Sequence, residues 1–155
     1  ATSATVEGQT TAHYIEDTIK EKKLFNTLLL PYTPQDKFND ALNCCDALLV
    51  TIAKGIDGIS FPSKLYTSLS VGRPIIAFSS ENSELRKKVE GNDVGCWVEL
   101  GDTDAFVEKI RYLINNPDEA KAMGKRARDL LVNEYSIKVS GKKYFDVLQK
   151  GFDAI

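Results

Sequence analysis

Residues 61–78, FPSKLYTSLSVGRPIIAF, decide the fold, because they predict a loop, a helix, a turn and a strand in direct succession. A proline and a serine are typical of the helix start, and Ser60 or Ser63 is placed to cap it. Gly72 can adopt the left-handed conformation that ends helices, and Pro74 prevents the helix from continuing. The β-rich residues at the end of the stretch then predict a strand.

The front of this predicted helix is suited to hold an anion. The first backbone N–H groups of a helix have no acceptor within it, and the helix dipole places its positive end there. Lys64 adds an ammonium group at the same end. The pattern predicts a phosphate or diphosphate site. A single lysine at a helix start is also typical of a solvated surface, which is the alternative interpretation.

The composition predicts one domain that spans residues 1–155. With 155 residues, 43% of them apolar, the chain is long enough for one substantial core and too short for two. The formal net charge of −2, from 20 basic and 22 acidic residues, disfavours nucleic acid as a partner. No apolar run approaches the roughly 20 residues that span a bilayer. The first ten residues lack the features of a secretion signal, so we expect a soluble, cytoplasmic chain.

The cysteines and the histidine show no pattern typical of catalysis or of metal binding. Cys44, Cys45 and Cys96 are odd in number and two of them are neighbours, which suits neither a disulfide framework nor a tetrahedral metal site. His13, the single histidine, has no identifiable serine or cysteine partner. We therefore expect reduced cysteines, no metal and no cofactor, and the sequence identifies no catalytic residue.

Apolar runs of strand length alternate with segments of helical period, which is typical of βα units around a parallel sheet. This predicts an α/β fold: a Rossmann-like, three-layer αβα arrangement with a mainly parallel sheet of about five strands and extra carboxyl-terminal helices. The predicted strands are residues 1–7, 27–30, 47–51, 75–78 and 95–98. Besides the helix that starts near Ser63, the predicted helices are residues 11–23, 35–45, 84–90, 104–115, 116–133 and 136–152.

Three loops are candidates for ligand binding, because open parallel sheets bind ligands beyond the carboxyl ends of their strands. They are residues 30–34, 52–62 and 79–83. The second of these is longer than the few residues of an ordinary βα connection. Its excess length predicts a segment that faces a ligand.

Four segments, taken with their order and spacing, carry a resemblance to a known family. They are LFNTLLLPYTPQDKF, CCDALLVTI, DGISFPSKLYTSLSVGRPIIAF and VEGNDVGCWVELGDTDAFVEKIRYLINNPDEAKAMGKRARDLLVNEYS. With them the chain resembles the carboxyl-terminal, donor-binding domain of the GT-B glycosyltransferases of family 4, also called glycosyl transferases group 1. The resemblance runs from about residue 8 to residue 148.

The resemblance implies a substrate-binding site for a nucleotide sugar. In the family, the helix start holds the diphosphate, the loop after an earlier strand holds the base, and a carboxylate within the helix takes the ribose hydroxyls. The residues implied here are Ser63, Lys64 and Leu65 at the phosphates, Tyr32, Thr33 and Pro34 at the base, and Gly58 and Ser60 near the sugar or phosphate.

The chain departs from the family pattern in two places. Thr67 stands where the family usually has its ribose-binding glutamate, so it can give one hydroxyl contact at most, and Asp57 stands at an altered spacing to it. The family's first βα unit, with its phosphate-clamping Arg and Lys, and the acceptor-binding domain have no match here. The missing strand is central in the family's sheet. Either residues 1–7 pair directly with residues 47–51, in the order 2-1-3-4-5, or the strand comes from elsewhere.

The function that the resemblance implies is donor binding for a retaining glycosyltransferase of polysaccharide biosynthesis. The expected donor is a nucleotide-diphosphate sugar, with a UDP-sugar favoured, and the transferred group is a hexose or an aminosugar. The expected acceptor is a glycan or a lipid-linked sugar, with possible peripheral contact to the inner face of the membrane. Two alternatives are a non-catalytic, flavodoxin-like binding or regulatory domain and a sugar-nucleotide epimerase. We expect no sugar transfer by the 155-residue chain alone.

Overall fold

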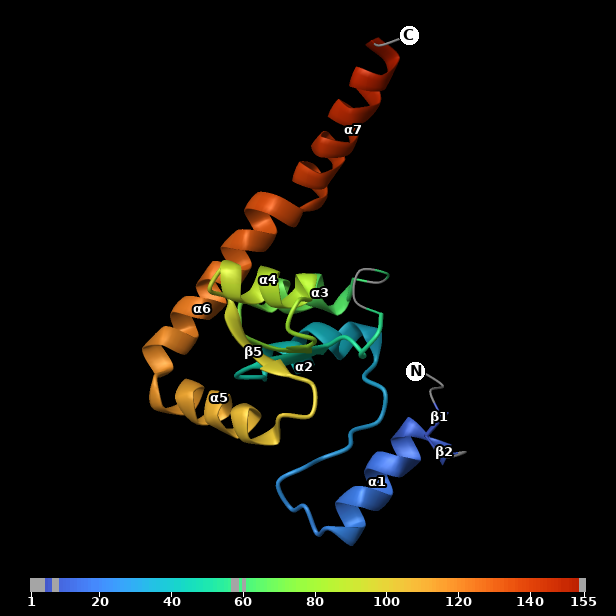
Figure 1. Ribbon diagram of the computed structural model, residues 1–155, viewed down its shortest axis with the longest axis vertical. Helices are drawn as coiled ribbons and strands as arrows, with labels where there is room; N and C mark the ends of the chain where they lie inside the picture. Colours follow the sequence, from blue (N-terminus) through green and yellow to red (C-terminus); the bar gives the residue numbers. More distant parts are fainter. Residues whose placement is uncertain (1–4, 7–8, 57–58, 60, 154–155) are drawn as a thin grey trace. The chain divides into compact units, whose positions relative to one another are not determined.

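The computed structural model describes residues 5–6, 9–56, 59 and 61–153 (Figure 1). The chain forms two compact units, Ala1–Leu42 and Asn43–Ile155, and each is described by itself. The single domain over residues 1–155 remains a prediction.

A parallel sheet forms the centre of the second unit. Its strands are β3 (Leu48–Thr51), β4 (Ile75–Ser79) and β5 (Gly95–Glu99), in the order β3-β4-β5. Leu48 pairs with Ile75, and Ile75 pairs with Gly95. The parallel α/β sheet predicted from the sequence is therefore confirmed, but the expectation of about five strands is wrong, since the sheet has three.

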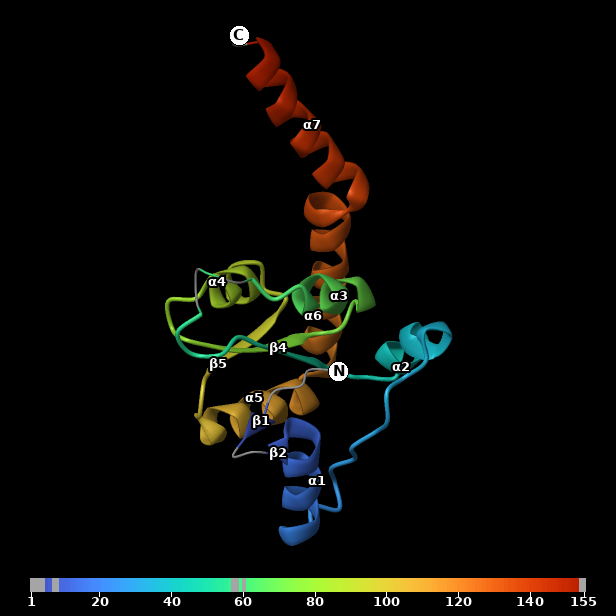
Figure 2. The ribbon, with the colours of Figure 1, turned by 90° about the vertical axis from the view of Figure 1, so that its right-hand side faces the viewer.

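Helices cover both faces of this sheet. The first face carries α3 (Lys64–Val71) and α4 (Glu84–Gly91), and the opposite face carries α5 (Thr103–Asn115), as Figure 2 shows. The long helix α6 (Pro117–Leu130) contacts both α3 and α5. The predicted three-layer αβα arrangement is present in this unit.

The sequence of β4 explains why both faces are covered. Side chains of a strand alternate between the two faces of a sheet. Ile75 and Ala77 belong to a buried cluster with residues of α3 and α4, whereas Ile76 belongs to a second buried cluster with residues of α5 and α6. An uninterrupted apolar strand of this kind is stable only between two layers.

The helix ends follow the signals that the sequence contains. Gly72 closes α3 with φ 70° and ψ 41°, in the left-handed conformation. Ser83 caps α4, because its side chain accepts a hydrogen bond from the amide of Arg86, and Asp102 caps α5 in the same way. Pro117 begins α6. These bounds lie within a few residues of those predicted from the sequence.

From Pro117 to Asp153 the chain is helical except at Ser136, which is extended. After α6 comes a single π-helical turn, η2 (Leu131–Tyr135), and then α7 (Ile137–Asp153). In both views α7 extends away from the sheet of its own unit (Figures 1 and 2). None of the helices among the described residues is long and apolar enough to cross a bilayer.

The first unit contains little regular structure. It comprises β1 (Thr5–Val6), β2 (Gln9–Thr10), α1 (Thr11–Glu21) and the short 3-10 helix η1 (Gln35–Lys37), and α2 (Phe38–Asn43) reaches its boundary. β1 pairs with β2 in an antiparallel, two-stranded sheet of its own.

One strand prediction fails in the first unit, and one pairing that the sequence left open is not formed. Residues 27–30 form no strand: Leu28 is 82% exposed and Leu30 is 72% exposed. A strand needs a ladder partner for its N–H and C=O groups, and among the described residues β1 and β2 pair only with each other. The direct pairing of residues 1–7 with residues 47–51, one of the two alternatives left open by the sequence, is not formed at Thr5 and Val6, because these residues pair with β2.

Candidate functional site

The candidate site lies at the start of α3, beyond the carboxyl end of β3. Ser63 occupies the N-cap position with φ −57° and ψ −26°, but its side chain makes no capping hydrogen bond. The sequence predicted a cap from Ser63 or Ser60, and Ser60 lies outside the described residues. Because the Ser63 hydroxyl is exposed and is not used as a cap, it is available to a ligand.

Only part of the predicted set of amide donors is free. The amide of Leu65 donates to the carbonyl oxygen of Pro62 at 3.0 Å, and the amide of Tyr66 donates to that of Ser63 at 3.1 Å. Within the described part of the chain, the amides of Ser63 and Lys64 have no acceptor. The donors that can meet an anion at this end are therefore these two amides and the Lys64 ammonium group.

The side chains of α3 divide into a buried and an exposed set. Leu65 is 1% exposed and belongs to the core, so it anchors the helix and offers no side-chain contact to a ligand. Ser63, Lys64 and Thr67 are exposed, and Lys64 and Thr67 are neighbours on one helix face. No acidic side chain in the described ranges forms an ion pair with Lys64.

The remaining predicted site residues fall into two groups. Gly58 and Ser60, together with Asp57, lie outside the described residues. Tyr32, Thr33 and Pro34 belong to the first unit, where Tyr32 and Pro34 are exposed and Thr33 is half-buried. Their roles at the base, the sugar and the phosphate remain predictions.

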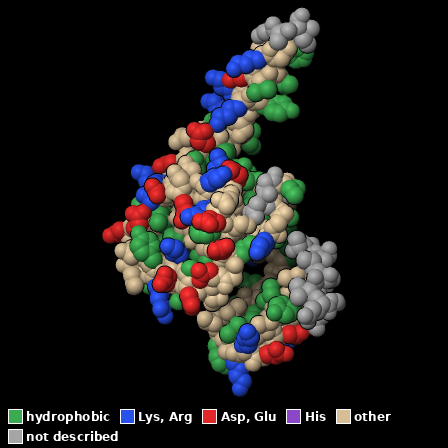
Figure 3. Space-filling model, in the orientation of Figure 1, with side chains coloured by type: hydrophobic (Ala, Val, Ile, Leu, Met, Phe, Trp, Pro, Cys, Tyr) green, Lys and Arg blue, Asp and Glu red, His purple; other side chains and the backbone are tan. Residues whose placement is uncertain are grey.

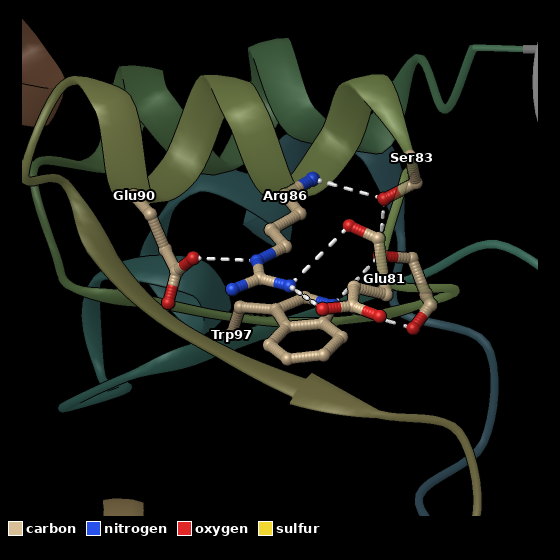
Figure 4. A network of polar contacts seen from close by, with 6 residues as sticks. Glu81, Ser83, Arg86, Glu90 and Trp97 are labelled. Atoms are coloured by element: carbon tan, nitrogen blue, oxygen red, sulfur yellow. Dashed lines mark hydrogen bonds and ion pairs between the residues drawn. The ribbon is translucent and has the colours of Figure 1, made fainter.

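A polar network that sequence reasoning missed lies at the carboxyl end of β4 (Figure 4). The hydroxyl oxygens of Ser79 and Ser83, both buried, are 2.5 Å apart. The indole N–H of Trp97 donates to the Ser79 hydroxyl at 3.0 Å and to the Ser79 carbonyl at 3.2 Å. These bonds tie the end of β4, the start of α4 and the middle of β5 together.

Arg86 completes this network from α4. Its guanidinium group lies 3.9 Å from the centre of the Trp97 ring, and its Nε donates to Glu90 at 2.7 Å. The hydrogen bond to Glu90 raises the pKa of Arg86. Glu81, in the loop before α4, lies 3.5 Å from the same guanidinium group. The loop between Ser79 and Ser83 is therefore held at both ends.

This loop and the start of α3 belong to the same edge of the sheet. The amide of Ile52, just after β3, donates to the carbonyl oxygen of Phe78 at 2.9 Å, so the two strands end at one level. Two serines placed four residues apart, at a strand end and a helix start, are the sequence signal for the network. Only the register of β4 and β5 shows that Trp97 reaches them.

A groove of about 740 Å³ lies at the opposite, amino-terminal end of the strands. Its lining is mostly apolar and includes Leu49 of β3, Ile76 of β4 and Phe106 and Ile114 of α5. It contains none of the predicted site residues. Because ligands of open α/β sheets bind at the carboxyl edge, we assign the candidate site to the start of α3 and not to this groove.

Metal-ligating side chains do not cluster in this region. Among the described residues there is no group of three His, Cys, Asp or Glu side chains that could hold an ion. Among the described residues, Cys44, Cys45 and Cys96 form no disulfide, and Cys96 is buried in the sheet. Burial raises the pKa of the Cys96 thiol.

Comparison with known proteins agrees with this fold. Residues 4–130 match the family described as Glycosyl transferases group 1. The match covers more than half of the chain, and the chain belongs to this family.

A curated relative is described as the probable glycosyltransferase WbjE from Pseudomonas aeruginosa. It is 26% identical to this chain over 132 residues, which cover 85% of this chain and 31% of the relative. The chain therefore spans about a third of the length of the relative that it matches.

Three solved structures share the fold. Sucrose-phosphate synthase from Thermosynechococcus elongatus has a TM-score of 0.73 at 17% identity, over 92% of this chain and 35% of that one. HepE from Anabaena, described in complex with UDP-glucose, has a TM-score of 0.71 at 14% identity, over 89% and 36%. TarM has a TM-score of 0.66 at 21% identity, over 92% and 26%. At these identities the likeness shows the fold alone.

Proposed function

We propose that this chain is the donor-binding part of a glycosyltransferase and that the start of α3 holds the diphosphate of a nucleotide sugar. The observation that carries the proposal is a set of donors with no partner in the described part of the chain: the amides of Ser63 and Lys64 and the Lys64 ammonium group, all at the carboxyl edge of the sheet. Membership of the Glycosyl transferases group 1 family supports it.

The chemistry follows from where charge develops during sugar transfer. When the bond between the anomeric carbon and the diphosphate breaks, negative charge grows on the diphosphate leaving group. Fixed donors aimed at that position stabilise the charge without reorganising. The positive end of the α3 dipole and the Lys64 ammonium group supply this field. Leu65 anchors the helix start in the core and so fixes the direction of the donors.

The proposal also specifies the donor, the acceptor and the stereochemistry of sugar transfer. A UDP-sugar is favoured as the donor, because a protein of the same fold is described in complex with UDP-glucose. The family resemblance supports transfer of a hexose or an aminosugar with retention of the anomeric configuration. It also supports a glycan or a lipid-linked sugar as the acceptor, at the cytoplasmic side of a membrane. Tyr32, Thr33 and Pro34 would contact the base, and Thr67 the ribose.

The proposal is tested by ligand-induced stabilisation of the 155-residue chain. UDP at 100 times its dissociation constant should add about 2.7 kcal/mol to the free energy of unfolding, which thermal denaturation detects. Lys64→Ala should weaken UDP binding about tenfold, the equivalent of one charge-assisted hydrogen bond. It should leave the binding of uridine, which lacks the diphosphate, unchanged.

Lys125→Ala is the matched control, because Lys125 is an exposed lysine of α6 without an ion pair in the described part of the chain. It should bind UDP as the parent chain does. Equal weakening by both lysine substitutions, or equal loss of UDP and uridine binding in Lys64→Ala, would contradict a diphosphate site at α3.

A further inference from the structure

Aromatic rings lie on both sides of the donor residues at the start of α3. Phe61 comes two residues before Ser63, and Tyr66 follows Ser63 by three residues. The centres of the two rings are 5.8 Å apart, and the ring planes are tilted by 47°. A ring contact therefore spans the segment that contains Ser63 and Lys64. Apolar contact between a residue just ahead of a helix and one near its first turn fixes the angle at which the chain enters the helix.

Tyr135 extends this contact to a part of the unit that is distant in sequence. Its ring centre lies 5.2 Å from that of Tyr66, in an edge-to-face arrangement at 68°. Tyr135 is the last residue of η2, which contacts α3. π-helical turns are rare and often occur at functional sites. The three rings of Phe61, Tyr66 and Tyr135 form what we call the aromatic row, and both of its end residues also pack against the buried cluster that contains Leu65.

Lys88 of α4 holds the far end of the aromatic row. Its Nζ lies 5.8 Å from the centre of the Tyr135 ring, in a cation–π arrangement. Hydrogen bonding to Tyr135 raises the pKa of Lys88, so this lysine keeps its charge. Tyr135 is thus held from α3, through Tyr66, and from α4, through Lys88. A ring that is held from two elements has few other orientations available.

The donors at the start of α3 depend on their direction. Figure 3 shows acidic and basic side chains interspersed over the viewed face of the second unit, and the net charge of the chain is −2. No broad positive field therefore gathers anions on this face. A small set of donors stabilises a diphosphate best when it is aimed before the ligand arrives. Ser63 and Lys64 are exposed, so their backbone is held by Leu65 on one side and by Phe61 on the other.

We propose that Tyr135 is a positioning residue for the diphosphate. Through its contact with Tyr66 it holds Phe61 in place. The aromatic row thereby sets the direction of the Ser63 and Lys64 amides. Tyr135 acts through Tyr66 and not by touching the ligand. The inference rests on the proposed diphosphate site at α3, and it adds to that site a residue that the spacing of the sequence does not reveal.

Titration calorimetry of the 155-residue chain with UDP and with uridine tests the proposal. Tyr135→Leu removes the ring but keeps an apolar side chain. It should weaken UDP binding about threefold to tenfold, which is the value of one edge-to-face ring pair converted to affinity. Uridine, which lacks the diphosphate, should bind as it does to the parent chain. Tyr135→Phe keeps the ring and should retain the UDP affinity to within about twofold.

A second variant breaks the same row at its centre. Tyr66→Leu should also weaken UDP binding and spare uridine. Because the two tyrosines act in one line, the double variant Tyr66→Leu with Tyr135→Leu should bind UDP no more weakly than Tyr66→Leu alone. Thermal denaturation of each variant shows that it is folded at the temperature of the titration. If Tyr135→Leu does not fold, Tyr66→Leu with the same pair of ligands carries the test.

NMR of the chain without ligand gives a readout that a loss of stability would not produce. Tyr135→Leu should shift the amide resonances of Ser63 and Lys64, because the segment that bears them changes direction. Tyr112→Leu is the matched control, since Tyr112 is an exposed tyrosine of α5, on the opposite face of the sheet. It should leave both resonances and the UDP affinity unchanged.

The possible failures of the two proposals differ. Lys64→Ala could weaken UDP binding while Tyr135→Leu and Tyr66→Leu left it unchanged. That result would overturn the positioning role and leave the site at α3 in place. Equal weakening of UDP and uridine by Tyr135→Leu would also overturn the positioning role, because it would indicate a general effect on the fold. No binding of UDP to the parent chain would overturn the proposed function and this inference with it.

Discussion

β4 and residues 27–30 have similar apolar compositions, but β4 is a buried strand and residues 27–30 are an exposed segment without regular structure. β4, Ile75–Ser79, lies between two parallel strands and two layers of helices, and its first three residues are at most 2% exposed. Residues 27–30 contain three leucines, form no strand and are exposed. An apolar run therefore becomes a strand only where neighbours supply ladder partners and cover both faces.

The largest difference between the two segments is expected when one apolar side chain in each is shortened to alanine. Ile75→Ala should lower the free energy of unfolding by about 2–5 kcal/mol, because it leaves a cavity among side chains that cannot collapse. Leu28→Ala should change it by less than about 0.5 kcal/mol, as for other exposed positions. Urea denaturation measures both. Similar costs at the two sites would show that residues 27–30 are buried.

A second test contrasts two helical glycines. A Cβ at Gly124 of α6 would lie 2.2 Å from the carbonyl oxygen of Gly72, whereas one at Gly141 of α7 would meet nothing within 4 Å. Gly124→Ala should cost about 1–3 kcal/mol through overpacking. Gly141→Ala should stabilise the chain or leave it unchanged, because alanine favours the helix. A gain from both substitutions would refute the close approach of α6 to Gly72.

A third test compares two serines at helix starts. Ser83→Ala removes the cap of α4 and a partner of the buried Ser79 hydroxyl, and should cost about 1 kcal/mol. Ser63→Ala removes no capping bond of α3 and should cost almost nothing. Thermal denaturation of the two variants measures the difference. Equal losses would mean that Ser63 also caps its helix.

The smallest effect is expected at the ion pair between Glu134 and Lys143. The hydrogen bond from Lys143 lowers the pKa of Glu134 from its ordinary value of 4.5. Its contribution to stability is therefore present above about pH 4.5 and is lost as the pH falls through the lower, folded-state pKa. Because both groups are exposed, Glu134→Gln should flatten the pH dependence of the melting temperature only slightly. A large loss of stability at pH 7 would contradict the exposure of this pair.

The sequence was sufficient to predict the second unit because its signals are local. Capping residues, the Gly72-Arg73-Pro74 turn and the apolar period set the bounds of β4, α4, β5 and α5 to within a few residues. The number of strands was not predictable in this way, since a run such as residues 27–30 becomes a strand only through partners distant in sequence.

The position of the candidate site was predictable from local sequence signals, but its hydrogen bonds were not. The sequence places Ser63 and Lys64 at a helix start, but only the structure shows that the amides of Leu65 and Tyr66 already have acceptors. The network of Trp97 with Ser79 also depends on strand register, which sequence spacing does not contain.

The most direct test of the central claim is an NMR titration of the isotope-labelled chain with UDP. The account predicts that the amide resonances of Ser63 and Lys64 shift most, since these two amides at the start of α3 have no acceptor among the residues that the structure describes. Leu49 and Ile114, in the groove at the other end of the strands, should not move. Shifts confined to that groove, or none up to about 1 mM UDP, the upper end of ordinary enzyme–substrate affinities, would contradict it.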